Sequence, residues 1–193
     1  MPTQTREAII QATIELFNEY GPMVPMAKIS ERAGVAAGTP FRYFPTKDAL
    51  LHAAYIAAHE HTLRLSPQAD IANLDSEQTV KSIIYTIMKW SALCPQELEY
   101  MRKYEDSVCY DCFSDRFSEE LYIGIVREHN LWPRLKNDVR PDLPESFINR
   151  VISINCSLYS RYIAHMGFQV DSPEFESFMH ASADSIWNSI RRM

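Results

Sequence analysis

Apolar residues recur at helical spacing along most of the chain. Ile9, Ala12, Leu16, Phe17 and Tyr20 are three or four positions apart, as on one face of an α-helix. Proline interrupts helices. The proline-free intervals are mostly too long for strands and have the length of helices: 3–21, 46–66, 68–94, 96–132, 145–172 and 174–193. The pattern predicts an all-α fold with about nine helices.

Helix-start signals support this prediction. Asp75 and Gln78 have the spacing of a capping box, in which each side chain accepts a hydrogen bond from the other residue's backbone N–H. Ser172 precedes Pro173, which places a good capping residue before a proline in the first helical turn. The segment 131–145 contains three prolines and is predicted to be the longest loop.

Composition and charge suggest two domains of different character. The chain has 193 residues and a formal net charge of −6. Residues 1–50 carry five basic and five acidic side chains, so all of the excess acid lies in residues 51–193. This asymmetry is typical of a head that faces nucleic acid and an acidic body. We therefore predict one domain at 1–50 and a second at 51–193.

Common catalytic and cofactor motifs are missing from the sequence. The five glycines do not form a dinucleotide-binding loop or a P-loop, and no G-x-S-x-G or H-E-x-x-H motif is present. The sequence therefore predicts a protein that is not an enzyme and holds no cofactor. The N-terminus lacks the pattern of a signal peptide, and no stretch is long enough for a membrane helix, so we expect a cytoplasmic protein without membrane contact.

Cys109 and Cys112 form a C-x-x-C pair that leaves one alternative function open. A thioredoxin-like site would need a βαβ context, and a zinc site would need further ligands at suitable spacing. We expect no metal and interpret the pair as incidental. The competing interpretation is an all-α redox or metal sensor that uses Cys109 and Cys112.

Residues 26–44 have the pattern of a helix-turn-helix. A short helical segment is followed by Gly34, which can adopt a positive φ at a tight turn, and then by a second short helical segment that starts near Ala36. The apolar residues Ile29, Val35, Phe41 and Phe44 can pack the two segments together. In this motif the second helix enters the major groove of DNA.

The stretch Ala33-Gly34-Val35-Ala36-Ala37-Gly38-Thr39-Pro40-Phe41-Arg42-Tyr43-Phe44-Pro45-Thr46-Lys47-Asp48-Ala49-Leu50 resembles the DNA-binding head of the tetracycline-repressor (TetR) family. The resemblance covers about residues 6–55, with the first helix included. It implies an N-terminal three-helix DNA-binding head, a helical ligand-binding and dimerisation body, and contacts to DNA from eight residues: Lys28, Ala37, Gly38, Thr39, Phe41, Arg42, Tyr43 and Lys47.

Three sites depart from the family pattern, and one of them is Pro25-Met26, which replaces the usual Ser or Thr cap before the first helix of the motif. Pro40 replaces a Leu or Ile that in the family often touches a thymine methyl, and Phe41 lacks the hydroxyl of the more frequent Tyr. We therefore expect an operator preference that differs from that of relatives, with one phosphate contact fewer at Phe41.

The body is rich in aromatic residues and methionine, which favours a cavity for an apolar or cationic aromatic effector. The alternative is a plain helical core. The candidate lining residues are Tyr85, Met88, Trp90, Tyr104, Phe117 and Tyr159.

The last two predicted helices carry more apolar surface than one packing partner needs. In 146–166 one stripe contains Phe147 and Val151, and a second contains Ile148 and Ile152. Two stripes indicate two partners, the body itself and a second subunit in a four-helix interface. The alternative is a helix pair buried within one chain. The candidate interface residues are Val151, Ile154, Leu158, Tyr162, Phe178, Ile186, Trp187 and Ile190.

Together these patterns predict a homodimeric transcription regulator, in the repressor role, that binds a palindromic double-stranded DNA operator and is released by a small effector. A third possible function for the same sequence is a protein–protein interaction module that binds no ligand.

Overall fold

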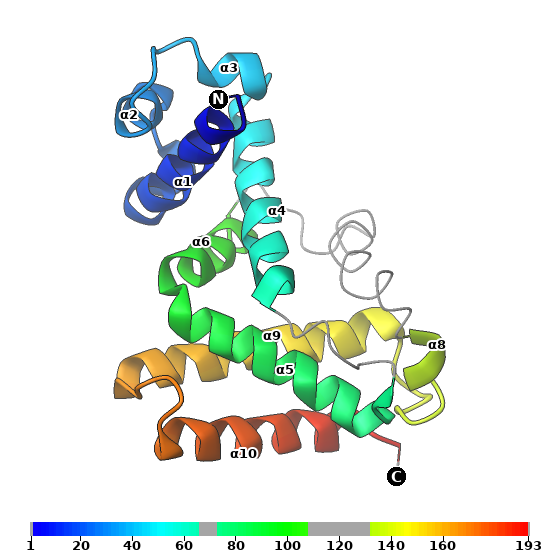
Figure 1. Cartoon of the computed structure of the whole chain (residues 1–193). Helices are drawn as coiled ribbons and strands as arrows, with labels where there is room; N and C mark the ends of the chain where they lie inside the picture. The colour runs from blue at the N-terminus through cyan, green and yellow to red at the C-terminus, as the bar shows by residue number, and fades with distance from the viewer. Residues whose placement is uncertain (1, 66–72, 108–131, 193) are drawn as a thin grey trace. The chain divides into compact units, whose positions relative to one another are not determined.

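The computed structural model describes residues 2–65, 73–107 and 132–192. The chain divides into two compact units (Figure 1). Unit 1 comprises Met1–His61 and Gln96–Phe117, and unit 2 comprises Thr62–Pro95 and Ser118–Met193. Unit 1 therefore extends beyond the predicted domain 1–50. The assignment of DNA binding to 1–50 and of effector binding and dimerisation to 51–193 stays a prediction.

Unit 1 contains the N-terminal helices. They are α1 (Pro2–Tyr20), the short 3-10 helix η1 (Gly21–Met23), α2 (Met26–Arg32), α3 (Pro40–Tyr43), α4 (Lys47–Leu65) as far as His61, and α6 (Pro95–Glu105) from Gln96 onward. Both α2 and α3 pack against α1 (Figure 1). The predicted stripe of α1 is buried at Ile9, Ala12, Leu16 and Phe17, whereas Tyr20 is exposed.

An aromatic cluster joins α6 to the N-terminal helices. The ring of Phe17 lies 4.9 Å from that of Tyr100 and 6.2 Å from that of Tyr104, in edge-to-face geometry. The hydroxyl of Tyr100 donates to the carbonyl of Leu51 at 2.6 Å, and Lys103 Nζ donates to the carbonyl of Asn18 at 2.6 Å. These contacts explain why residues far along the chain belong to unit 1.

Unit 2 contains α5 (Ser76–Leu93), α8 (Trp132–Leu135), α9 (Glu145–Met166) and α10 (Pro173–Ile190). Helices α5, α9 and α10 pack against one another (Figure 1). Their shared core is built from thirteen buried residues: Val80, Ile84, Met88, Val139, Ile148, Cys156, Ile163, Phe175, Met179, Ala183, Ile186, Trp187 and Ile190.

The structure confirms both predicted helix starts. The Asp75 carboxylate accepts from the backbone N–H of Gln78 at 2.8 Å, and the Gln78 side chain accepts from the N–H of Asp75 at 3.2 Å. At α10, the Ser172 hydroxyl accepts from the N–H of Phe175 at 3.2 Å. The described elements are helical, as predicted, and their regular structure includes no named strand.

The predicted loop at 131–145 was partly wrong. It contains the short helix α8, and Val139 pairs with Arg191 in an isolated antiparallel bridge. Two backbone hydrogen bonds flank that bridge, from Arg140 to the carbonyl of Ile190 at 2.8 Å and from Arg192 to the carbonyl of Asp138 at 2.7 Å. Proline spacing cannot reveal such long-range pairing, because its partner lies some fifty positions away. Across the described residues, no helix is both long and apolar enough to cross a membrane.

Candidate nucleic-acid interface

The turn after α2 is fixed by a helix-ending hydrogen-bond pattern. The N–H of Val35 donates to the carbonyl of Ser30 at 2.9 Å, and the N–H of Gly34 donates to that of Glu31 at 3.0 Å. These two bonds are those of a Schellman motif, which requires a left-handed residue after the helix. Gly34 supplies it with a φ of +68°. The chain therefore reverses here in one defined geometry, as the sequence predicted.

A buried hydroxyl links α2 to the segment that follows the turn. Ser30 is 2% exposed. Its Oγ lies 3.0 Å from the carbonyl of Met26 and 3.3 Å from the carbonyl of Ala37. The second contact holds residue 37 against α2. Nothing in the sequence pattern singled out Ser30, because serine at this position is also typical of an exposed helix face.

The second helix of the motif begins later than predicted. We expected a helix from about Ala36, but α3 spans only Pro40–Tyr43. The N–H of Thr39 donates to the carbonyl of Ala36 at 2.8 Å, in a tight i to i+3 turn. Pro40 has no N–H with which to continue an α-helical ladder back to Ala36, so regular α-helix starts at the proline itself.

The two sides of this segment differ sharply in burial. Pro40 and Phe44 are buried, and the guanidinium of Arg6 lies over the Phe44 ring at 5.3 Å. Ala37, Gly38 and Arg42 are exposed, and Phe41 is 50% exposed. We call Ala37, Gly38, Phe41 and Arg42 the recognition face. Arg6 was missed by the sequence analysis, because nothing local links it to Phe44.

The basic residues of the head fall into two groups. Arg32 pairs with Glu15 at 2.8 Å. Lys28 Nζ donates to the Tyr20 hydroxyl at 3.0 Å, and this bond raises the pKa of the Lys28 ammonium. In contrast, Arg42 and Lys47 make no ion pair with any described residue. These two cations are therefore available to an anionic or polar partner.

The eight predicted DNA-contact residues all belong to unit 1. They lie on α2 (Lys28), the turn before α3 (Ala37, Gly38 and Thr39), α3 (Phe41, Arg42 and Tyr43) and the first position of α4 (Lys47). Thr39, Tyr43 and Lys47 are half-buried, and the other five are exposed. Most of the predicted DNA-contact residues are therefore open to solvent. Their contact with DNA stays a prediction.

The predicted effector residues are dispersed. Tyr104 lies in the aromatic cluster of unit 1, where its ring is 5.0 Å from that of Tyr55. Met88 and Trp90 are buried in unit 2, and Met88 belongs to the shared core. Phe117 lies outside the described residues.

The two predicted tyrosines of unit 2 have hydrogen-bond partners. The Tyr85 hydroxyl donates to Glu176 at 2.7 Å, and burial together with this carboxylate raises the pKa of Tyr85 to about 12. Tyr159 donates to Ser185 at 3.2 Å. These contacts give both residues a structural role, and a role in effector binding stays a prediction.

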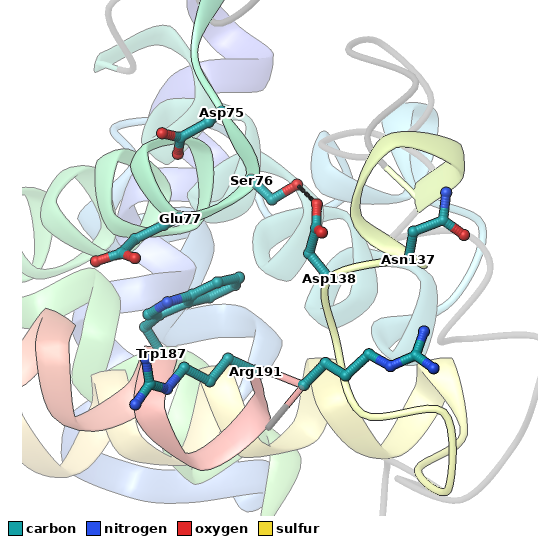
Figure 2. Close-up of a pocket in the computed structure, with 8 residues that line it drawn as sticks. Asp75, Ser76, Glu77, Asn137, Asp138, Trp187 and Arg191 are labelled. Atoms are coloured by element: carbon teal, nitrogen blue, oxygen red, sulfur yellow. Dashed lines mark hydrogen bonds between the residues drawn. The ribbon is translucent and has the colours of Figure 1, made fainter.

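Unit 2 also has a polar pocket of about 480 Å³ (Figure 2). It is lined by Asp75, Ser76, Glu77, Asn137, Asp138, Trp187, Arg191 and Arg192. Ser76 Oγ donates to Asp138 at 2.5 Å across it, and the carboxylate of Asp75 is engaged in the α5 cap (Figure 2). This polar lining does not match the aromatic effector site expected from the sequence.

The alternative based on Cys109 and Cys112 gains no support, because both residues lie outside the described residues. The buried Cys156 belongs to the core of unit 2, and burial raises the pKa of its thiol to about 12. A thiol of that kind is unreactive, because the thiolate is the nucleophile and metal ligand.

The two predicted stripes of α9 have different environments. Ile148 and Ile163 are buried in unit 2. The other side of the helix exposes a row that we call the α9 stripe: Phe147, Val151, Ile154, Leu158, Tyr162 and Met166. Val151 is half-buried, whereas the other five are at least 45% exposed. The structure therefore leaves most of this apolar stripe exposed, although Tyr162 stacks on Phe178 and Val151 packs against the core of unit 2.

The α10 part of the predicted interface needs correction. Ile186, Trp187 and Ile190 are at most 5% exposed and lie in the core of unit 2. They are unavailable to a second subunit, because α5 and α9 already cover them. Phe178 is half-buried and stacks on Tyr162 at 5.0 Å, beside the α9 stripe. Helical periodicity shows that a face is apolar but not which neighbour covers it.

Comparison with known proteins supports the helix-turn-helix reading. Residues 9–54 match the family of bacterial regulatory proteins known as the tetR family. This range contains α2, the Gly34 turn, α3 and the recognition face.

Solved structures of similar fold extend the likeness over the whole chain. A TetR family transcription regulator from Marinobacter aquaeolei VT8 aligns with a TM-score of 0.80 at 14% identity, over 100% of this chain and 98% of that one. A TetR-family transcriptional regulator from Haemophilus influenzae RD gives 0.66 at 18%, over 99% and 98%. TylP, a TetR regulator from Streptomyces fradiae, gives 0.65 at 18%, over 100% and 89%. At these identities the likeness establishes a common fold. Residues 9–54 therefore match the tetR regulatory family, and the chain has the fold of the solved regulators along its length.

Proposed function

We propose that the chain is a homodimeric transcription regulator, in the repressor role, that binds a palindromic DNA operator and is released by a small apolar or cationic aromatic effector. The observation that carries the proposal is the recognition face. It combines two small residues, an exposed aromatic ring and an unpaired guanidinium on a segment that the Gly34 turn holds in place. Small residues allow the backbone to approach a groove closely, and the larger ones can reach base edges.

Dimerisation is supported by the α9 stripe. Contiguous exposed apolar patches on soluble proteins mark interaction sites. The neighbouring α10 exposes the small residues Ser177, Ala181 and Ser185, which would let a second helix pair approach closely. In a dimer with two-fold symmetry, the α9 stripe of one copy packs against the α9 stripe of the other. The dimer then brings two recognition faces to one duplex.

The effector part of the proposal rests on composition and on the family resemblance. The aromatic composition of residues 51–193 and the family resemblance favour an aromatic or cationic guest. A panel of neutral aromatic compounds and aromatic quaternary ammonium ions tests it. We expect at least one compound to raise the melting temperature and to dissociate the DNA complex. A compound that stabilises the protein without releasing DNA contradicts the proposed response.

The DNA-binding part is tested by selecting duplexes from a random library with the purified full chain. We expect an inverted repeat to be enriched and its affinity to fall steeply with salt, because a chain with net charge −6 must bind through a locally basic surface. A selection that enriches no sequence, or binding that salt does not weaken, contradicts the proposed function.

A further inference from the structure

Burial within the helix-turn-helix segment limits which side chains can contact a base. From residue 37 to residue 44, Pro40 and Phe44 are buried, and Thr39 and Tyr43 are half-buried. Ala37 and Gly38 are exposed but too short to reach far from the backbone. Phe41 and Arg42 are therefore the two large side chains that this segment exposes most fully.

Arg42, like Lys47 and in contrast to Arg32 and Lys28, has no acidic or hydroxyl partner among the described residues. Arg32 is held by Glu15, and Lys28 is held by Tyr20. A guanidinium that is exposed and unpaired retains its full planar set of donors. Its best match in the major groove is guanine, whose O6 and N7 accept two hydrogen bonds from one arginine.

Phe41 exposes half of an apolar ring on the same short helix. It has no hydroxyl and so cannot hydrogen-bond to a phosphate. The major groove presents one apolar group to such a ring, the 5-methyl group of thymine. A contact with that methyl removes apolar surface of both partners from water.

Phe41 and Arg42 are consecutive, so the bases they contact must be close together. The helix rises about 1.5 Å per residue, whereas base pairs are spaced by about 3.4 Å. Consecutive side chains diverge by about 100° around a helix, but two that both reach the same groove contact the same or neighbouring base pairs.

We infer that Arg42 and Phe41 determine sequence specificity, with Arg42 reading a guanine and Phe41 reading the methyl group of a thymine in an adjacent base pair. The inference rests on the proposed DNA-binding function and narrows it to a T·A pair beside a G·C pair in each half-site.

The experiment compares the wild-type chain with Arg42→Ala, Arg42→Lys and Lys47→Ala on duplexes selected by the wild type. Replacing the guanine should weaken wild-type binding by roughly 5- to 150-fold. Arg42→Ala should lose most of this discrimination at that one position. Arg42→Lys keeps the positive charge and should lose part of the discrimination. Lys47→Ala is the control, because the family resemblance implies that Lys47 contacts a phosphate. A lost phosphate contact weakens binding to all sequences alike and lowers the salt slope by about one.

Phe41 is tested by replacing the thymine with uracil, which removes only the methyl group. Wild-type binding should fall by roughly fourfold, since a buried methyl is worth about 0.8 kcal/mol. Phe41→Ala should bind the two duplexes equally. Melting temperatures of the variants check that each is folded, as expected for exposed positions.

The outcomes separate this inference from the proposed function. If Arg42→Ala weakens all sequences alike, as Lys47→Ala does, Arg42 is a phosphate contact and the inference is overturned while DNA binding stands. A selected half-site without thymine next to guanine also overturns it, as does equal wild-type affinity for thymine and uracil. If the wild type enriches no sequence, the proposed function itself fails.

Discussion

Gly34 carries the turn on which the recognition face depends, because its φ of +68° is one that other residues adopt only at a cost. Nothing lies within 4 Å of a Cβ built at this position, so the cost of a substitution is confined to the backbone. The sequence could predict this turn, since glycine after a short amphipathic helix is a strong local signal. It could not predict the contact of Ser30 with Ala37 or the unpaired state of Arg42, which depend on where the rest of the chain lies.

We expect Gly34→Ala to lower the free energy of unfolding by about 1–2 kcal/mol, as an alanine at positive φ requires. Gly38→Ala is the matched control: Gly38 is exposed, has ordinary φ and has open space around its Cα. Denaturant unfolding should show a much smaller loss for Gly38→Ala, although DNA affinity should fall because the added methyl lies on the recognition face. Equal stability losses for the two variants would show that the turn geometry is not the cause.

His59 of α4 is a half-buried titratable residue of unit 1. Its ring lies 4.6 Å from that of Tyr55, its Nε2 atom is buried without a hydrogen-bond partner among the described residues, and burial lowers its pKa to about 3. In the unfolded chain, the pKa of His59 should be near 6.5. Above about pH 6.5 both states are neutral at this residue and no stability is lost. Below it, the unfolded state takes up the proton first, and stability falls until the pH nears the folded pKa.

Between about pH 6.5 and pH 5, the wild type should therefore lose up to about 2 kcal/mol more stability than His59→Phe. Urea unfolding at the two pH values measures the difference. His180→Phe, at an exposed position of α10, serves as the control and should follow the wild type. A His59→Phe variant that follows the wild-type pH dependence would mean that His59 is protonated in the fold.

At the scale of elements, the helix starts and the two-sided character of α9 followed from the sequence, whereas helix lengths and coverage did not. The capping pairs at α5 and α10 are local, so their residues alone identify them. The length of α3 depended on Pro40, whose presence shortened the expected helix. The apolar face of α10 was correctly identified but assigned to the wrong partner, because α5 and α9 cover Ile186, Trp187 and Ile190 within one subunit.

The α5 cap gives a direct test at this scale. Asp75→Ala should reduce the free energy of unfolding by about 1 kcal/mol, because the N–H of Gln78 loses its acceptor. Asp75→Ser keeps a capping oxygen and should retain most of the stability. Thermal unfolding of the three proteins measures this, and an Asp75→Ser variant as unstable as Asp75→Ala would contradict a capping role.

For the whole molecule, operator recognition as proposed needs two copies of the chain held together through the α9 stripe. Leu158 lies in the middle of that stripe and is 55% exposed. We expect Leu158→Glu to weaken self-association at least tenfold, about 1.4 kcal/mol, because it places a charge at the centre of an apolar contact. Ala164→Glu adds the same charge at an exposed position of α9 outside the stripe and should associate as the wild type does. Sedimentation over a concentration series measures the self-association of the two variants. Equal weakening by both would mean that the interface lies elsewhere on the molecule.

The most direct test of paired DNA recognition is to vary the spacing between the two selected half-sites. Because a two-fold dimer must place both recognition faces on one duplex, inserting about five base pairs, half a turn of the duplex, should reduce affinity to that of a single half-site. Fluorescence anisotropy with the intact, spaced and single half-site duplexes measures this. Unchanged affinity for the spaced duplex would mean that the two heads bind independently, which contradicts recognition of one operator by a paired dimer.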